Sequence, residues 1–203
     1  MTNHTENTPG INMSTNETHY TLFYSAHNAN GFMSNWYRAT FELDGRWFTS
    51  TEQWYTYKKA KYFGDYATAE RIMKTDDCRM QKRLGRRVRP FSQHEWMQVA
   101  ENVMFRGNKA KFCQNEELLQ KLLGTGDTLL AESSGYDKVW GTGYFSDHTY
   151  ARRQDKWPGK NLLGKVLMKV RTELRSPQQE QEEGGVGTPV SVAMATHTPN
   201  KYE

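Results

Sequence analysis

Two residues on one predicted helix, Glu52 and Lys59, have the types and the spacing to act on a common ligand. They fall on one face of a helix over residues 50–65, two turns and roughly 10 Å apart. That separation is too long for a simple ion pair, but both side chains can reach a molecule bound between them. A carboxyl group transfers protons, and a desolvated lysine amine acts as a nucleophile. Alternatively, Glu52 only caps the helix and Lys59 only faces solvent.

A second candidate cluster follows the apolar run 128–131 and begins at Glu132. The other candidate site residues in this cluster are Asp137, Trp140, Gly141 and Gly143. An apolar element that ends in a polar loop is a typical way to build a site. Burial at that end would raise the pKa of Glu132 and suit it to acid–base work. The glycines would let the backbone approach a ligand closely. Alternatively, the cluster is an Asp- and Gly-rich turn with a packed tryptophan.

A basic run, KRLGRRVR, occupies residues 82–89 and includes Arg86. It leads into Pro90 and a helix whose capping box runs from Ser92 to Glu95. Helix N-termini attract phosphate, and neighbouring arginines reinforce that attraction. A solvated basic face or a nuclear-localisation-like patch is the other interpretation. The net charge of +4 is compatible with a phosphate-bearing ligand without being diagnostic of one.

The helix that carries the first pair of candidates has clear signals at both ends. Thr49 or Ser50 can serve as its N-cap. Glu52 or Gln53 then closes a capping box. Gly64 suits the left-handed residue that usually lies just past a helix end. These signals predict a helix that begins near residue 50 and ends before residue 64.

The remaining elements are predicted from hydrophobic period and turn residues. They are a strand over 20–24, a hairpin around 44–45, helices over 67–74, 94–105 and 116–124, a short strand or helical turn over 128–131, a basic loop over 144–160, and a last helix after Asn161 as its cap. Trp96 belongs to a 3.6-residue apolar stripe, so its spacing alone indicates a core residue. Together these patterns predict a mainly α fold with a small β-hairpin element.

Composition bounds the architecture and the class of protein. Of the 203 residues, 1–19 and 176–203 are polar and lack a hydrophobic period, so we expect disordered tails. Residues 20–175 have the size of one ordinary domain. No apolar run approaches membrane-spanning length, which predicts a soluble protein without a membrane partner. Two separated cysteines predict reduced thiols in an intracellular protein, cytoplasmic or nuclear, and the scattered histidines predict no metal site.

A set of short motifs occurs in order between residues 20 and 175. The motifs are FYS (23–25), SNWY (34–37), FxSTE (48–52), Lys59-Ala60, FGD (63–65), LGR (84–86), Trp96, KFxQN (111–115), Glu132, Asp137, WGxG (140–143) and NLLGxxLMxVR (161–171). No single motif is specific, but the ordered set closely resembles the NADAR (YbiA-like) family. The tails lie outside the resemblance, and the 142–160 loop is longer than in compact bacterial members.

The resemblance implies a single compact multihelical domain that hydrolyses N-glycosidic bonds to ribose. Two substrate classes are associated with the family: ADP-ribose on guanine bases of DNA, removed in an antitoxin or repair activity, and ribosylamino intermediates of riboflavin synthesis. The stand-alone domain and the basic run at 82–89 favour the first class. A pyrophosphate-bearing substrate would use those arginines more fully than a monophosphate. The scheme requires no cofactor, and we expect the protein to act as a monomer.

The resemblance also indicates roles for the candidate residues. Glu132 is the first choice for acid–base work, and Glu52 is the second, with a further role in holding ribose hydroxyls. Lys59 offers another route through a Schiff base, so the lead residue stays open between Glu132 and Lys59. We expect ligand contacts from Asn35, Tyr55, Arg86, Trp96, Asp137, Trp140, Gly141, Gly143 and Asn161.

Two further functional classes compete with an enzyme. A non-catalytic reader of ADP-ribose or nucleic acid would use the same basic run and aromatics, but it does not need Glu52, Lys59 and Glu132 together. A plain nucleic-acid-binding protein would bind with steep salt dependence and without regard to ADP-ribose. The small basic excess makes this third interpretation the weakest.

Overall fold

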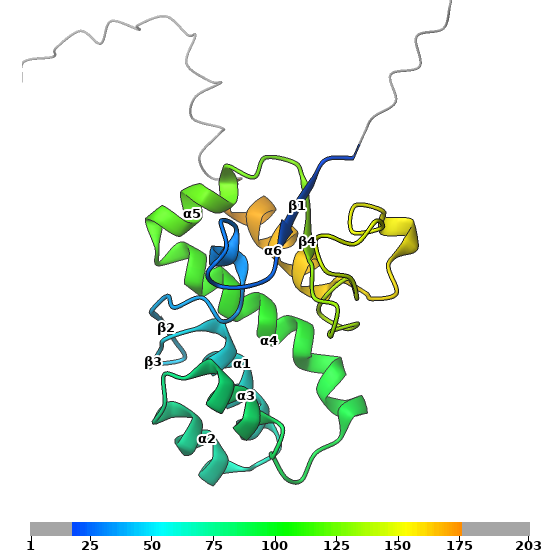
Figure 1. Cartoon of the computed structure of the whole chain (residues 1–203). Helices are drawn as coiled ribbons and strands as arrows, with labels where there is room; N and C mark the ends of the chain where they lie inside the picture. Colours follow the sequence, from blue (N-terminus) through cyan, green and yellow to red (C-terminus); the bar gives the residue numbers. More distant parts are fainter. Residues whose placement is uncertain (1–17, 176–203) are drawn as a thin grey trace, which may run out of the picture.

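One long helix, α4 (Gln93–Cys113), runs through the centre of the molecule, and the other elements pack along it (Figure 1). The computed structural model describes residues 18–175. The remaining helices are α1 (Thr51–Tyr62), α2 (Tyr66–Met73), α3 (Cys78–Gly85), α5 (Glu116–Leu123) and α6 (Leu162–Arg175), with 3-10 turns η1 (Gly31–Met33) and η2 (Gln154–Lys156). The predicted mainly α fold is therefore confirmed.

Two small sheets complete the fold. Strand β1 (Tyr20–Phe23) pairs in parallel with β4 (Leu129–Glu132), and Phe23 lies opposite Glu132. Strand β2 (Phe41–Leu43) pairs antiparallel with β3 (Arg46–Phe48). Asp44 and Gly45 between them have φ of 53° and 70°. Two left-handed residues in a two-residue loop are typical of a tight hairpin, so the predicted hairpin is confirmed.

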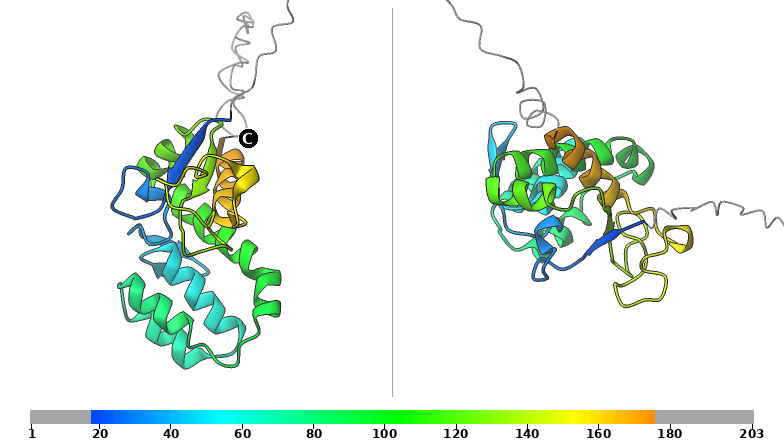
Figure 2. Two further views of the ribbon diagram at one scale, coloured as in Figure 1. Left: turned by 45° about the vertical axis from the view of Figure 1, so that its right-hand side comes forward. Right: turned by 90° about the horizontal axis from the view of Figure 1, so that it is seen from above.

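The hydrophobic core consists of two clusters that share α4. One lies among β1, β4, α5, α6 and one end of α4, and contains Phe23, Phe32, Met33, Ala39, Met104, Phe112, Leu118, Leu122, Leu130, Leu163, Val166, Leu167 and Val170. The other lies among the hairpin, α1, α2 and α3, and contains Phe41, Phe48, Trp54, Tyr57, Ala60, Ala69, Ile72, Leu84 and Val88. Figures 1 and 2 show α1 to α3 gathered at one end of α4 and the β1–β4 pair at the other.

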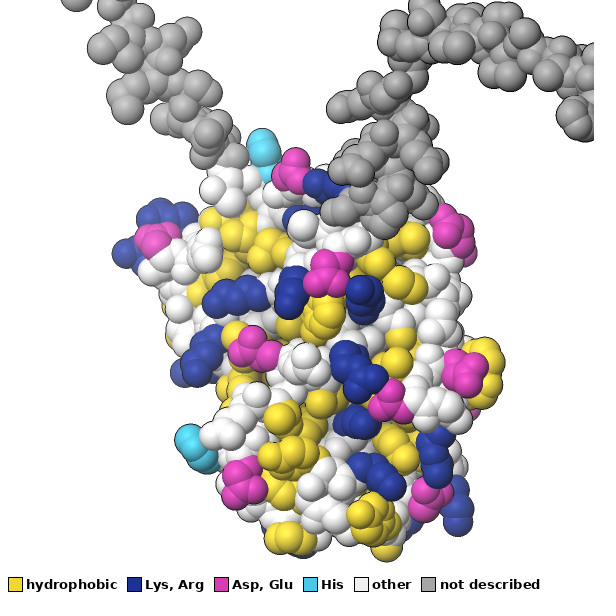
Figure 3. Space-filling view, turned by 180° about the vertical axis from the view of Figure 1, so that it is seen from behind, with side chains coloured by type: hydrophobic (Ala, Val, Ile, Leu, Met, Phe, Trp, Pro, Cys, Tyr) yellow, Lys and Arg dark blue, Asp and Glu magenta, His cyan; other side chains and the backbone are white. Residues whose placement is uncertain are grey.

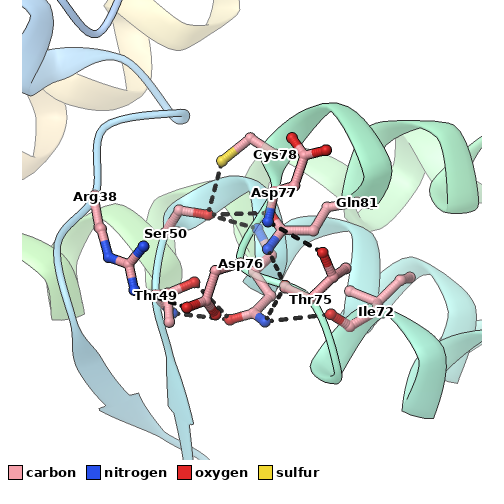
Figure 4. Close-up of polar contacts among 10 residues, drawn as sticks. Arg38, Thr49, Ser50, Ile72, Thr75, Asp76, Asp77, Cys78 and Gln81 are labelled. Carbon is pink, nitrogen blue, oxygen red and sulfur yellow. Dashed lines mark hydrogen bonds and ion pairs between the residues drawn. The ribbon is translucent and has the colours of Figure 1, made fainter.

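A buried polar network holds the start of α1 against α3 (Figure 4). Ser50 is the N-cap of α1, and its Oγ accepts a hydrogen bond from the backbone N–H of Gln53 at 3.1 Å. The same hydroxyl donates to Oε1 of Gln81 at 3.3 Å, and Gln81 donates to the carbonyl of Thr75 at 2.7 Å. Because these groups are buried and satisfied, the first turn of α1 is fixed in place, and with it the side chain of Glu52.

The structure departs from the sequence predictions in three places. Helix α3 was not predicted. Its second half, Lys82–Gly85, belongs to the basic run, and the helix is too short to show a clear apolar period. Helix α4 continues to Cys113, well past the predicted end at residue 105. Asn161 precedes α6, but its side chain bonds to β4, with Oδ1 accepting from the N–H of Glu132 and Nδ2 donating to the carbonyl of Leu130.

The predicted tails lie outside the described residues, apart from residues 18 and 19. Both cysteines are free thiols. Within residues 18–175, no helix is long and apolar enough to cross a membrane. In the same part of the chain, no cluster of three or more His, Cys, Asp or Glu side chains has an arrangement suited to a metal ion.

Candidate active site

The two candidate carboxyl groups, Glu52 and Glu132, lie on different elements but within electrostatic reach of each other. Glu52 lies in the first turn of α1, and Glu132 is the last residue of β4. The negative charge of Glu52 raises the pKa of Glu132, and the charges of Lys82 and Asp137 act on both carboxyls. The region lies where the two core clusters meet, with Tyr55 of α1 packed against the β1–β4 cluster.

Glu52 is held by the loop that precedes the hairpin. Its carboxylate Oε2 accepts a hydrogen bond from the indole Nε1 of Trp36 at 3.3 Å, and its backbone N–H donates to the carbonyl of Asn35 at 3.0 Å. The residue is only 8% exposed. Burial raises the pKa of Glu52 to about 7, although the charge of Lys82 and the Trp36 hydrogen bond oppose the rise. The Glu52 carboxylate is therefore bonded to Trp36, while Ser50 supplies the side-chain cap of the helix.

Glu132 is the more strongly perturbed of the two carboxyls. Its Oε2 is buried and has no hydrogen-bond partner within residues 18–175. Burial raises the pKa of Glu132 to about 8, and the charge of Asp137 raises it further while Lys82 opposes the rise. At neutral pH, Glu132 is therefore mainly protonated, and Glu52 is close to half ionised. Two carboxyls with different pKa values near neutrality are suited to divide the acid and base roles between them.

Lys59 lies farther along the same helix, at the edge of this region. Its Nζ lies 3.8 Å from the ring centroid of Phe91. Burial lowers the pKa of Lys59, and the neighbouring Arg89 lowers it further, whereas Glu52 raises it. A partly desolvated amine beside an aromatic face is a better nucleophile at neutral pH than a solvated lysine. The influence of Glu52 supports a common environment, and a shared ligand stays a prediction.

Tyr55 contacts Trp96 and Trp140 and forms with them an aromatic wall within electrostatic reach of Glu52. The hydroxyl of Tyr55 accepts a hydrogen bond from Nε1 of Trp96 at 2.7 Å. The ring of Tyr55 contacts those of Trp96 and Trp140 edge to face, with centroids 5.2 and 5.5 Å apart. Trp96 is 2% exposed, in agreement with its place in an apolar stripe. Its side chain therefore shapes the wall, and stacking of Trp96 on a ligand base stays a prediction.

The loop after β4 is shaped by contacts within the protein. Oδ1 of Asp137 accepts hydrogen bonds from the N–H groups of Val139 and Trp140, both at 2.8 Å. A Cβ at Gly141 would lie 2.8 Å from the carbonyl of Asp137, and Gly143 has φ of 81°. These glycines are thus required by close packing and backbone conformation. Contacts of this loop and of Asn161 with a ligand stay predictions.

A basic pocket adjoins Glu52 on the side of α3. It has a volume of about 540 Å³ and is lined by Trp36, Arg79, Lys82, Arg83, Arg86 and Arg87. Trp36 joins the two sites, because it lines the pocket and also donates to Glu52. Over the face seen in Figure 3, by comparison, acidic and basic side chains are interspersed. The pocket therefore concentrates positive charge beside the carboxyls.

Trp36 and Lys82 were not predicted as site residues. Trp36 belongs to the SNWY motif, in which only Asn35 was selected. The side chain of Asn35 accepts a long hydrogen bond of 3.4 Å from Asn108, whereas the neighbouring indole reaches the carboxyl. Lys82 lies in the basic run, and its Nζ is 5.6 Å from the ring centroid of Trp36. Its place in the SNWY motif was the available sequence signal for Trp36.

Known proteins similar to this chain identify its family. The model of the NADAR domain matches residues 22–175. The chain belongs to the NADAR family. An N-glycosidase of Acanthamoeba polyphaga mimivirus is 40% identical over 163 residues, which are 76% of this chain and 95% of that protein. The N-glycosidase YbiA of Escherichia coli is 31% identical over 75% of this chain and 86% of its own length.

A solved NADAR structure and a larger relative complete the comparison. The NMR structure of E. coli YbiA matches with a TM-score of 0.64 and 28% identity, covering 85% of this chain and 91% of YbiA. A riboflavin biosynthesis protein of Vibrio vulnificus is 33% identical over 75% of this chain, but the match covers only 38% of that protein. The resemblance inferred from the motifs, and the YbiA-like fold, are therefore confirmed.

Proposed function

We propose that this NADAR protein is an N-glycosidase that removes ADP-ribose from ADP-ribosylated guanine bases in DNA. The observation that carries the proposal is that Glu52, which is buried, and Glu132, whose Oε2 is buried, have pKa values raised to about 7 and about 8 beside a basic pocket. The names of its relatives, which include N-glycosidases of a mimivirus and of E. coli, support the class of reaction. The basic pocket supports a substrate that carries phosphate.

The reaction breaks the bond between C1 of ribose and an exocyclic amine of the base. Glu132, protonated at neutral pH, donates its proton to the leaving nitrogen as the bonding electrons pass to that nitrogen. Water then adds to C1 and returns a proton to the Glu132 carboxylate. Positive charge develops on the sugar ring during departure, and the partly ionised Glu52 stabilises it while accepting hydrogen bonds from ribose hydroxyls.

The pocket on α3 accommodates the pyrophosphate in this scheme. Arginine side chains form paired, charge-assisted hydrogen bonds with phosphate oxygens, and the pocket offers four of them together with Lys82. A substrate that placed its phosphates there would bring its ribose towards Trp36 and Glu52. The wall of Tyr55 and Trp140 would then face the bases. This placement favours ADP-ribose over a monophosphate.

A Schiff-base route through Lys59 is a variant of the same function. An N-glycoside of an exocyclic amine can open its ring to an imine, and the lysine amine can then exchange into that imine and release the base. The lowered pKa of Lys59 supports this route. Borohydride reduction in the presence of substrate should trap an adduct on Lys59. Absence of the adduct, together with full activity of Lys59→Met, would rule the route out.

The decisive experiment compares two DNA oligonucleotides that carry ADP-ribose on guanine and on thymine. We expect release of ADP-ribose from the guanine substrate alone, measured by mass spectrometry. Glu132→Gln should bind this substrate and fail to release ADP-ribose, whereas Glu101→Gln, an exposed carboxyl on α4, should act like the wild type. Binding by the wild type without turnover would identify a reader and contradict the enzyme.

Similarity to the riboflavin biosynthesis protein of V. vulnificus favours a second candidate function. In that case, the substrate would be a ribosylamino intermediate of riboflavin synthesis, with a single phosphate in the basic pocket. Incubation with such an intermediate, followed by measurement of released ribose phosphate, distinguishes the two candidates. Turnover of the intermediate without turnover of the modified DNA would select the riboflavin pathway.

A further inference from the structure

Three solvent-exposed aromatic side chains form a connected cluster beside the β1–β4 pair. Tyr24, Tyr136 and Phe145 are 40%, 86% and 37% exposed. The ring of Phe145 contacts Tyr24 and Tyr136 edge to face, with centroids 5.7 and 5.0 Å apart. We call this cluster the aromatic rim. Contiguous exposed aromatic surface is uncommon on a soluble protein and marks an interaction site more often than isolated exposed rings do.

The aromatic rim lies at the same edge of the sheet as the candidate acid. Tyr24 directly follows Phe23, which pairs with Glu132, so its Cα lies about one strand residue, ~3.3 Å, beyond that pair. Tyr136 directly precedes Asp137, whose charge raises the pKa of Glu132. The loop that carries Tyr136 and Phe145 stands out beside the two strands (Figure 2). Both halves of the rim therefore border the site.

Contacts within the protein support Phe145 and the loop around it. Phe145 packs on Gly135 so closely that a Cβ there would lie 2.6 Å from its ring. Next to Phe145, the ring of Tyr144 stacks on His148 with centroids 3.8 Å apart and planes 9° from parallel. The hydroxyl of Thr142 bonds to Tyr144 as well. A rigid aromatic surface binds planar groups at a low cost in conformational entropy.

Two lysines give the surroundings of the rim a positive charge. Lys138 and Lys160 are exposed, and their backbones are joined by a hydrogen bond from the N–H of Lys160 to the carbonyl of Lys138 at 2.9 Å. Neither forms an ion pair in the part of the chain that the structure describes. Exposed aromatic rings with nearby unpaired cations match the chemistry of single-stranded nucleic acid, whose bases stack and whose phosphates attract lysine.

We propose that the aromatic rim binds the unmodified bases of a single nucleic-acid strand that flank the modified nucleotide. This inference rests on the proposed function, because it places a polynucleotide substrate at the same site. It assigns the 142–160 loop a role in substrate choice, since that loop supplies Phe145 and the residues that support it. A free nucleotide or a small metabolite has no flanking bases and gains nothing from the rim.

The test measures binding of an unmodified, fluorescently labelled single strand of about twelve nucleotides by anisotropy. Tyr136→Ala should weaken binding by about 5- to 150-fold, the range expected for loss of one base stack. Tyr136→Phe keeps the ring and should bind like the wild type. Trp47→Ala removes a ring that is 63% exposed on the hairpin, and should leave binding unchanged. Equal binding by Tyr136→Ala and the wild type would overturn the proposal.

Salt dependence gives a second readout that does not need turnover. Each phosphate contact that is lost lowers the slope of log affinity against log salt by about 0.7 for a single strand. Lys138→Gln combined with Lys160→Gln should therefore reduce the slope by about 1.4. An unchanged slope would show that these lysines do not meet the strand and would contradict their part in the proposal.

Failure of the rim and failure of the proposed function have different signatures. If the protein releases no ADP-ribose but Tyr136→Ala binds the strand more weakly than the wild type, the proposal for the rim is supported and the proposed hydrolase activity is contradicted. If ADP-ribose is released from modified guanine while Tyr136→Ala binds and turns over strands normally, the reverse holds. Sedimentation of the free protein tests whether the chain self-associates. If the wild type is a dimer and Tyr136→Ala is a monomer, the rim is a contact between two copies of the chain, and the proposal is overturned.

Discussion

Glu132→Gln should stabilise the fold at alkaline pH, even though it removes the candidate acid. The pKa of Glu132 rises from its ordinary value of 4.5 to about 8 on folding. Between these values the unfolded chain loses the proton and the folded chain keeps it, so the free energy of unfolding falls as pH rises from about 4.5 to 8. Each pKa unit corresponds to about 1.4 kcal/mol, which sets an upper limit of about 5 kcal/mol.

Glutamine is uncharged at every pH and close to glutamic acid in shape, so it avoids this loss. Urea denaturation of the wild type and Glu132→Gln should give similar free energies of unfolding at pH 4.5. At pH 8.5 the variant should be more stable by about 2–5 kcal/mol. Glu101→Gln, on the exposed face of α4, is the matched control and should show no such gap. A difference between wild type and Glu132→Gln that stays constant with pH would refute the reasoning that Glu132 is buried in the protonated form.

Three further predictions concern the site and its support. The rate of ADP-ribose release, measured as kcat/KM against pH, should decline above pH about 8 as Glu132 loses its proton, and a rate that rises steadily to pH 10 would contradict an acid role. Trp36→Phe removes the indole hydrogen bond and should raise the pKa of Glu52 above about 7. The acidic limb of the same pH profile should then move to higher pH. An acidic limb at the same pH as in the wild type would show that the bond is unimportant. Asn161→Ala loses two hydrogen bonds to β4 and keeps a strained φ of 51°. Urea denaturation should therefore show a free energy of unfolding lower by about 2–4 kcal/mol. A decrease below about 0.5 kcal/mol would contradict the view that Asn161 anchors β4.

The elements that local signals define could be predicted from the sequence. The hairpin follows from Asp44-Gly45, which adopt the left-handed conformations that such a turn requires. The start and end of α1 follow from the Ser50 cap and from Gly64, whose φ is 73°. The parallel pairing of β1 with β4 could not be predicted, because it joins segments more than 100 residues apart and no local pattern records it. Helix α3 was missed because its charged face dominates a short segment.

The candidate site shows the same division. Burial of Glu132 could be predicted from the apolar run before it, and its pKa is raised as expected. The influence of Glu52 on the pKa of Glu132 depends on the tertiary packing of α1 and β4, which spacing within one helix cannot reveal. The sequence also could not show that Asp137 and Gly141 shape the loop after β4, because this depends on how the loop folds back on itself.

Lys82 would connect the proposed phosphate binding to proton uptake. It lines the basic pocket, and its charge lowers the pKa of both Glu52 and Glu132. An anion that pairs with Lys82 cancels part of that influence, so both pKa values rise when the pocket is filled. Binding near pH 7.5 is therefore accompanied by the uptake of protons, and the heat of binding measured by calorimetry depends on the ionisation enthalpy of the buffer. In the proposed reaction, the phosphates of the substrate thus favour the protonated form of Glu132.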